Sequence, residues 1–220
     1  MAVLDLLLPP ACAGCGTYGS AICDPCRTSL RPPVEPGDAF LGMDRATIVG
    51  DALLVGVAAF AHRDEAQRIL RRLKYGGGQR LAEPLARLAA PALRQLLTNS
   101  GSAVLVPVPL HEGRHRERGY NQAALLAEAL ARETRVRVWP GLVRRRATER
   151  QHGLDRTTRL RNLRDAMAVG RAPPPEGRIP ETVVVVDDIL TTGATFEACA
   201  VILRAAGVTA VYGFAIAREL

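Results

Sequence analysis

The chain has 220 residues, 48% of them apolar and 23% charged, which is enough to bury one sizeable core and excludes a fibrous or intrinsically disordered protein. Its formal net charge is +7, and residues 111–164 alone hold fourteen arginines against six acidic residues. This local positive charge favours a polyanionic partner, either a pyrophosphate-bearing metabolite or a nucleic-acid backbone, with a solvated arginine-rich surface as the alternative.

The leucine-rich residues 1–10 lack the pattern of a signal peptide. No basic region precedes the apolar stretch, Asp5 interrupts it, and no apolar run in the chain approaches the ~20 residues needed to span a bilayer. We expect a docking segment or a short helix whose leucines pack on the main domain. We also expect a cytoplasmic location.

Four of the five cysteines follow the pattern C-x2-C-x7-C-x2-C, at Cys12, Cys15, Cys23 and Cys26. Four thiolates complete the tetrahedral shell of a structural zinc site, which keeps no open position for catalysis. Two disulfides or a redox-active C-x-x-C are the alternatives, but the lack of an export signal disfavours disulfides and the two pairs together favour a metal. We therefore predict a structural Zn²⁺. The fifth cysteine, Cys199, lies in an apolar helical pattern and is expected to be a small core residue.

Apolar patterns and turn signals divide the rest of the chain into alternating strands and helices. The Pro-rich residues 31–38 predict a linker, so that residues 1–50 form an N-terminal segment with the cysteine module and residues 51–220 form the main domain. The predicted elements are strand 54–60, helices 64–73 and 81–97, strand 103–108, a loop to residue 120, helix 121–132, strand 136–143, an arginine-rich stretch to residue 164, a Pro-rich loop 171–180, strand 182–186, helix 195–206 and strand 209–216. This alternation predicts an α/β fold, a parallel sheet with helices on both faces, whose ligands bind beyond the carboxyl ends of the strands.

Residues 183–195, which read VVVVDDILTTGAT, are the strongest signal in the chain. The four valines predict a strand buried on both faces, and Asp187 and Asp188 follow at its tip, where carboxylates can accept hydrogen bonds from vicinal hydroxyls or hold a divalent cation. The next turn opens a helix whose free amides, dipole and hydroxyls can cradle an anion, and Gly193 allows close approach of a phosphate. The pattern predicts a ribose 5-phosphate site. The alternative is an ordinary strand–turn–helix crossover whose aspartates cap the helix.

This segment resembles the phosphoribosyl-pyrophosphate (PRPP) motif of type I phosphoribosyltransferases: an apolar strand, two acids, two spacer residues and T-T-G-x-T. The resemblance implies that Asp187 and Asp188 face the 2′- and 3′-hydroxyls of the ribose and that the turn holds its 5′-phosphate, with Mg²⁺ accompanying PRPP. The turn consists of Thr191, Thr192, Gly193, Ala194 and Thr195.

Three other segments resemble the ComF family, which joins such a domain to an N-terminal zinc finger. Residues 106–122 are similar to its V-P-V-P-L…R-G-[YF]-N-Q segment and to the pyrophosphate loop of amidophosphoribosyltransferases, residues 142–162 to its L-x-R-x-x-x-T-x-x-Q-x-x-L-x-x-x-x-R-x-x-N signature, and residues 73–76 to its L-K-Y-x-G segment. The chain lacks the third C-x-x-C of many members, which bears on the shape of the module.

The ComF resemblance implies roles for several basic residues. Pyrophosphate would lie at residues Pro109, Arg114 and Arg118, and Lys74, the only lysine, would face the same anion. Residues 142–162 would form a hood that closes over the substrate and excludes water from the reacting sugar, and its Arg144 and Arg159 would be catalytic together with Asp187 and Asp188.

The resemblance also implies a function. It indicates a type I phosphoribosyltransferase-like protein that binds PRPP or a related ribose phosphate and is associated with DNA uptake in natural transformation. No acceptor pocket and no glutaminase region can be recognised, so whether the chain is an enzyme stays open. One alternative is an accessory protein that binds single-stranded DNA mainly through charge, without transferase turnover. Another is an active phosphoribosyltransferase of nucleotide metabolism or salvage. Competence proteins are further expected partners.

Overall fold

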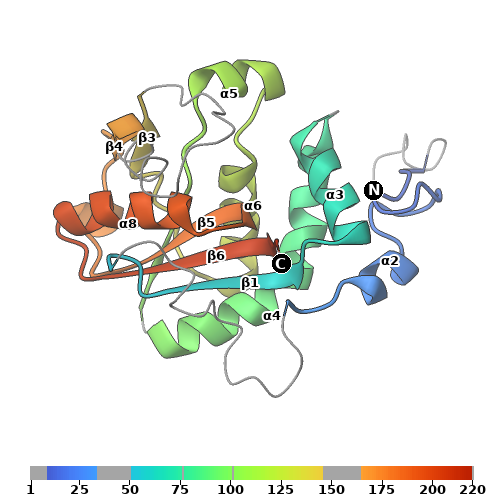
Figure 1. The fold of residues 1–220 in the computed structure, drawn as a ribbon, viewed down its shortest axis with the longest axis horizontal. Coiled ribbons are helices and arrows are strands. Elements are labelled where there is room, and N and C mark those ends of the chain that lie inside the picture. Colours follow the sequence, from blue (N-terminus) through green and yellow to red (C-terminus); the bar gives the residue numbers. More distant parts are fainter. Residues whose placement is uncertain (1–8, 34–50, 76, 101, 146–164, 220) are drawn as a thin grey trace.

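The structure is a computed structural model that describes residues 9–33, 51–75, 77–100, 102–145 and 165–219. Within these residues, a four-stranded parallel sheet in the order β1-β6-β5-β2 forms the centre of the main domain (Figure 1). Its strands are β1 (Val55–Ala61), β2 (Val104–Pro107), β5 (Thr182–Leu190) and β6 (Ala210–Arg218). Because all the strands run parallel, their carboxyl ends meet at one edge of the sheet.

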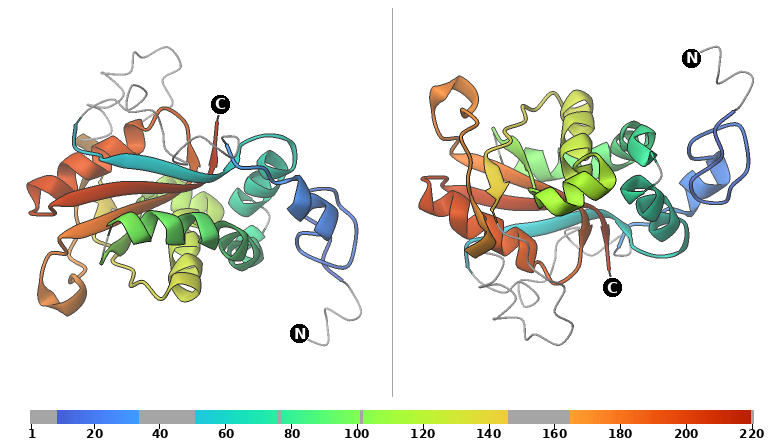
Figure 2. Two further views of the ribbon diagram at one scale, coloured as in Figure 1. Left: turned by 90° about the horizontal axis from the view of Figure 1, so that it is seen from below. Right: turned by 90° about the horizontal axis from the view of Figure 1, so that it is seen from above.

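Helices cover both faces of this sheet (Figures 1 and 2). The helices α4 (Ala82–Ser100) and α6 (Gln122–Thr134) pack on one face, and α8 (Ala194–Ala205) packs on the other. Two further helices, α3 (Asp64–Lys74) and α5 (Glu112–Arg118), follow the carboxyl ends of β1 and β2, and a 3-10 turn, η2 (Gly78–Leu81), leads into α4. The predicted α/β fold with helices on both faces is confirmed.

The core lies on both sides of β5, whose four valines are fully buried. Val184 and Val186 face the cluster formed with α3, α4 and α6, whereas Val183 and Val185 face the cluster formed with α8. Successive residues of a strand point to opposite faces, so a continuous apolar run is what a sheet covered on both sides requires. The sheet therefore anchors the segment that follows these valines.

Strand β5 is longer than the sequence predicts, because it continues through both aspartates to Leu190. Strand β6 pairs with it along this extension, with Asp187 opposite Ala215. On the other side, the ladder with β2 ends where Val186 faces Pro107. The acid pair thus lies inside the strand, at a place where one of its two neighbouring strands has already ended.

The prediction of one strand over residues 136–143 is wrong. Val138 forms only an isolated parallel bridge with Leu105, after which Pro140 and Gly141 interrupt the extended segment. The chain then enters β3 (Leu142–Arg144), which pairs antiparallel with β4 (Met167–Val169) in a separate two-stranded sheet. This small sheet lies next to α8, on the side of the molecule that carries Asp187.

The loop predicted before residue 121 contains the short helix α5. Its start is capped by His111, whose Nδ1 accepts the N–H of Gly113, and it ends at Gly119 with a positive φ of 78°. A left-handed residue at a helix end is tolerated best by glycine. The helix places Arg114 and Arg118 on an ordered element rather than on a free loop.

Some predictions lie outside the described residues. They are the docking of residues 1–8, the linker beyond residue 33 with the domain boundary near residue 50, and the hood residues 146–164, which include Arg159. Among the helices that are described, none combines the length and hydropathy required to cross a bilayer.

Candidate functional site

The acid pair of β5 gives the candidate site two different sides. Asp187 and Asp188 are consecutive strand residues, so their side chains start on opposite faces of the sheet, yet their carboxyl groups still interact with each other. Asp188 faces Lys74 of α3, whereas Asp187 lies in the electrostatic neighbourhood of Arg144 and Cys199. The Oδ1 of Asp187 also accepts the backbone N–H of Asp188 at 2.8 Å, which fixes its orientation.

Lys74 is the last residue of α3 and forms an ion pair with Asp188. Its Nζ lies 2.6 Å from Asp188 Oδ2, and the two side chains are only 22% and 6% exposed. The resemblance implied that Lys74 faces an anionic ligand. In this structure its ammonium contacts a carboxylate of the predicted sugar site instead.

The protonation of the acid pair depends on its surroundings. Burial raises the pKa of Asp187 well above its usual value, and the neighbouring charge of Asp188 raises it further. The backbone N–H of Asp188 and the ammonium of Lys74 oppose this rise.

His62 and Glu219 belong to the same edge, although no motif in the sequence pointed to them. His62 follows β1 and donates its backbone N–H to the carbonyl of Arg218 at 2.7 Å, while Glu219 follows β6 and donates to the carbonyl of Leu190 at 2.9 Å. Burial lowers the pKa of the His62 imidazole, and Lys74 lowers it further, against the charges of Glu219 and Asp188. The only available signal was their position after predicted strands, and it required knowledge of the strand order.

The turn after β5 enters α8 through a left-handed glycine. Gly193 precedes α8 with a φ of 77°, a left-handed conformation that glycine adopts without strain. The N–H of Ala194 has a long contact of 3.4 Å to Thr192 Oγ1, and the Glu197 N–H already bonds to the Gly193 carbonyl. Thr191 is exposed, so the mouth of the turn is open to solvent. The first amides of a helix have no acceptor within the helix, which makes a helix amino end a favourable position for an anion.

The structure brings two of the ComF-like segments into contact. The hydroxyl of Tyr120 donates to the carbonyl of Leu73 at 2.5 Å, and the guanidinium of Arg118 lies 5.1 Å from the ring centroid of Tyr75. Arg118 also donates to Gln122 Oε1 at 3.0 Å. Residues 73–75 and 118–122 therefore form one unit, which the Lys74–Asp188 ion pair joins to the acid pair.

The remaining predicted residues differ in how closely they approach this unit. Burial lowers the pKa of Arg144, as does the charge of Arg114, while Cys199 and Asp187 oppose the shift. Arg144 of β3 thus lies on the Asp187 side, together with Arg114. Pro109 is buried behind the end of β2, where the Asn121 side chain donates to the Val108 carbonyl at 2.9 Å.

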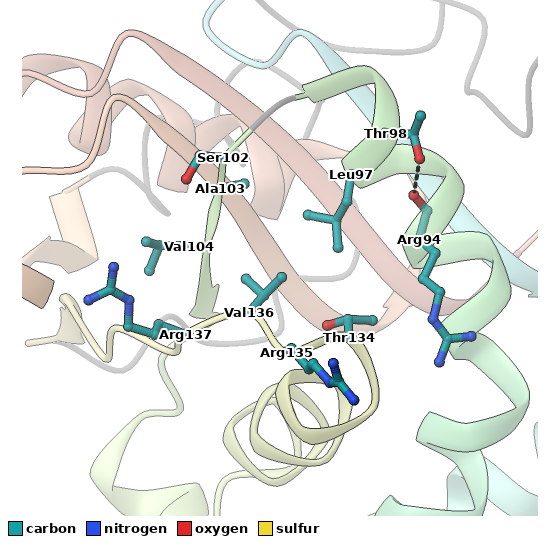
Figure 3. Close-up of a pocket in the computed structure, with 10 residues that line it drawn as sticks. All are labelled: Arg94, Leu97, Thr98, Ser102, Ala103, Val104, Thr134, Arg135, Val136 and Arg137. Carbon is teal, nitrogen blue, oxygen red and sulfur yellow. Dashed lines mark hydrogen bonds between the residues drawn. The ribbon is translucent and has the colours of Figure 1, made fainter.

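A cavity of about 490 Å³ lies at the opposite, amino edge of the sheet, between the ends of α4 and α6 and the start of β2 (Figure 3). Two of its arginines are already engaged: Arg94 donates to the carbonyl of Glu133, and Arg137 forms an ion pair with Glu176. Both helices direct their carboxyl ends to this region, which disfavours an anion there. The cavity is therefore separate from the acid-pair site and is poorly suited to bind an anion.

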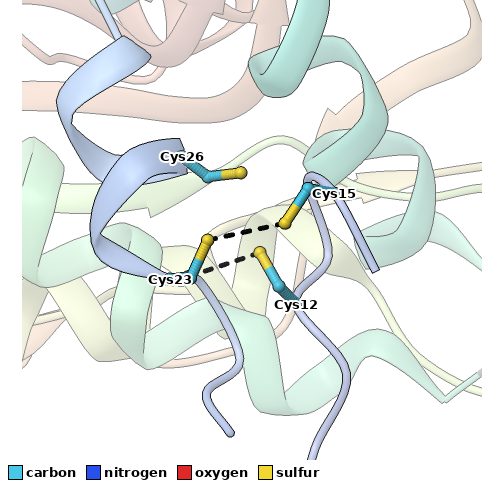
Figure 4. Close-up of side chains that lie close together, drawn as sticks. All are labelled: Cys12, Cys15, Cys23 and Cys26. Atoms are coloured by element: carbon cyan, nitrogen blue, oxygen red, sulfur yellow. Dashed lines mark hydrogen bonds between the residues drawn. The ribbon is translucent and has the colours of Figure 1, made fainter. Parts of the chain in front are cut away.

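The four cysteines of the N-terminal module converge on one point (Figure 4). Their sulfur atoms all lie within 4.8 Å of one another, and the four thiols are unpaired rather than joined as disulfides. Cys12 Sγ accepts the N–H groups of Gly14 at 3.4 Å and of Cys23 at 3.3 Å. Against the effect of burial, such amide donors lower the pKa of the Cys12 thiol to about 6. The cluster is an arrangement that could hold a metal ion such as zinc.

The cysteine module docks on α3 (Figures 1 and 2). Arg68 Nε donates to the carbonyl of Gly14 at 2.7 Å, and Arg72 donates to the carbonyl of Cys12 at 3.3 Å. Cys12 and Cys26 belong to the same apolar cluster as the buried face of α3. The helix that carries Lys74 at its end is therefore supported along its length by the module.

The fold defines an α/β protein with a four-stranded parallel sheet covered by helices on both faces and an N-terminal cluster of four cysteines. Comparison with known proteins narrows this class. No family model matches the chain. The DNA utilization protein YhgH of Escherichia coli K12 is 33% identical over 172 residues, which make up 76% of this chain and 72% of the relative. Competence protein F of Haemophilus influenzae is 29% identical over 95% of this chain and 85% of its own, and competence protein ComFC of Bacillus subtilis is 30% identical over 69% and 59%. The chain belongs to the ComF family.

Proposed function

We propose that this chain is a DNA-utilization protein of the competence type that binds PRPP or a related ribose phosphate at the carboxyl edge of its sheet. The proposal rests on one observation: the acid pair at the end of β5 is followed, within a few residues, by a turn with the left-handed Gly193 that opens α8. Carboxylates next to a helix amino end match a ligand that has vicinal hydroxyls at one end and a phosphate at the other.

In this proposal, each part of the ligand would contact a different group of residues. The turn of residues 191–195 would hold the 5′-phosphate through backbone amides and threonine hydroxyls. Asp187 and Asp188 would accept the ribose hydroxyls. The pyrophosphate would lie toward the basic residues Lys74, Arg114 and Arg118, which come from the ends of α3 and α5. Mg²⁺, whose oxygen-rich preferences suit PRPP and a carboxylate, would neutralise part of the pyrophosphate charge.

The module would hold one structural zinc through Cys12, Cys15, Cys23 and Cys26. Four thiolates leave no position for water, so this metal would support the fold and take no part in chemistry. Whether PRPP is turned over depends on an acceptor. Pyrophosphate release that requires an added acceptor would identify a transferase, and ligand binding without release would identify a binding protein.

The sugar-site proposal is tested by calorimetric titration with Mg–PRPP. The double variant Asp187→Asn with Asp188→Asn should lose measurable binding, because both hydroxyl acceptors lose their charge while the strand keeps its shape. Glu181→Gln is the matched control, since Glu181 is an exposed acid just before the same strand and should leave binding unchanged. Undiminished PRPP affinity in the double variant would contradict the proposal.

Single-stranded DNA is the second candidate ligand, favoured by the names of the relatives, which refer to DNA utilization and competence. Tyr18 and Tyr75 are 75% and 48% exposed, so their rings can stack on bases. The net charge of +7 would attract the phosphates of the DNA. Binding of a labelled oligonucleotide should fall steeply between low and physiological salt. Oligonucleotide binding without PRPP affinity would favour this function over the first.

A further inference from the structure

We propose that Lys74 is an internal competitor for the sugar site: its ammonium holds Asp188 until the hydroxyls of a ligand displace it, and it then binds the ligand's pyrophosphate. The inference rests on the proposed function and deepens it, because it gives Lys74 two successive partners. It also assigns Asp188 a change of partner on binding.

The first support is the state of the Asp188 carboxylate. Its Oδ2 is buried and has no aligned hydrogen-bond donor among the described residues, although Lys74 Nζ lies only 2.6 Å away. The contact therefore compensates charge without supplying a directed hydrogen bond. A carboxylate oxygen in this condition keeps lone pairs for hydroxyl donors, which would add the directed hydrogen bonds that the ion pair lacks.

The second support is that the contacts that hold the backbone around Lys74 do not involve its side chain, whose ion pair is with Asp188. The carbonyl of Leu73 receives the Tyr120 hydroxyl, the ring of Tyr75 packs under Arg118, and the Tyr75 N–H bonds to the carbonyl of Arg72. The long lysine side chain can therefore move between partners by rotation about its own bonds, without a shift of α3.

The third support is that Arg118, next to Lys74 in space, has an N–H group that could bind an anion. Arg118 Nε is buried and, within the described part of the chain, has no hydrogen-bond acceptor. The Arg118 guanidinium lies over Tyr75, the residue next to Lys74. An anion bound here would satisfy the Arg118 N–H and offer the released ammonium a new counter-charge.

Two variants and two separate ligands test the exchange. In Lys74→Met, ribose 5-phosphate should bind about tenfold more tightly because its competitor is gone, whereas inorganic pyrophosphate should bind about tenfold more weakly because it loses a cation. In Asp188→Asn the order should reverse: pyrophosphate binds more tightly because Lys74 is released, and ribose 5-phosphate binds more weakly. Arg71→Met removes an exposed charge from the same helix and should change neither affinity.

Calorimetry of each ligand at constant Mg²⁺, with circular dichroism to establish that each variant is folded, gives the readout. Asp188→Asn keeps the test valid if Lys74→Met does not fold. A crossover of the two affinities supports the exchange. Equal weakening of both ligands in Lys74→Met, or weaker pyrophosphate binding in Asp188→Asn, would overturn it while leaving the proposed function intact. A wild-type protein that binds neither ligand would overturn both.

Discussion

At the scale of single residues, the acid pair shows how one strand can give two identical side chains different properties. Asp188 is compensated by Lys74, and burial together with Asp188 raises the pKa of Asp187. A carboxyl group whose pKa is raised by folding contributes most to stability below its unfolded pKa of about 4, and this contribution is lost as the pH rises through the folded value. The wild-type fold is thus penalised by Asp187 at neutral and alkaline pH.

Asp187→Asn should remove this penalty. The variant should be more stable than the wild type at pH 8, and the difference should shrink toward pH 4, where Asp187 is protonated in the folded state and becomes protonated in the unfolded state as well. Urea unfolding at pH 4, 6 and 8, followed by the fluorescence of the single tryptophan, Trp139, measures the effect. Glu181→Gln should show no such trend, and an Asp187→Asn variant that is less stable than wild type at pH 8 would contradict the assignment.

At the scale of elements, α3 connects the cysteine module with the candidate site. Its side chains Arg68 and Arg72 hold carbonyls of the module, and its last residue, Lys74, contacts the acid pair. A change in the module should therefore also affect the end of α3. The physical route is direct packing, since Cys12, Ile69 and Leu73 share one apolar cluster.

Cys12→Ser should lower the zinc content from about one ion per chain to a small fraction, because three thiolates bind zinc far less tightly than four. We expect the melting temperature to fall by about 5 °C and amide exchange in α3 to accelerate, since the module loses its hold on this helix. Metal analysis and hydrogen exchange measure both effects.

Cys199→Ser is the control, because Cys199 lies in the core next to Met167 and away from the cluster of four thiols. It should lower stability without any change in zinc content. Zinc retained in Cys12→Ser, or lost in Cys199→Ser, would rule out the proposed metal site.

At the scale of the whole molecule, the sheet joins two apolar clusters into one cooperative unit. Phe196 of α8 is 2% exposed and packs so closely over Gly213 of β6 that a Cβ there would lie 3.1 Å from its ring. Leu93 of α4 is fully buried on the opposite face. Both clusters depend on the same strands, so weakening either one should destabilise the entire main domain.

Phe196→Ala and Leu93→Ala should each cost about 3–5 kcal/mol of unfolding free energy, because each leaves a cavity that the packed sheet cannot fill. In both variants, unfolding followed by Trp139 fluorescence and by far-ultraviolet circular dichroism should give coincident transitions. Separate transitions for the two probes would show that the two faces unfold independently.

The local parts of the candidate site could be predicted from the sequence. Four consecutive valines fit only a strand that is buried on both faces, and the glycine before α8 lies in the left-handed conformation that the motif requires. The C-x2-C pairs likewise predicted a cluster that the structure brings together. In each case the determining interactions join residues that are close in the chain, so the amino-acid pattern carries the information.

Tertiary structure decided the remainder. The Lys74–Asp188 pair joins residues from α3 and β5, and His62 and Glu219 reach the site only because β1 and β6 neighbour each other in the sheet. The extension of β5 through the acids likewise depends on the length of its partner β6. Strand order and partner length arise from packing between distant segments, which local patterns do not encode. The amino-acid sequence by itself therefore determined the chemical groups and local turns of the site, and the packed sheet decided which charges meet there.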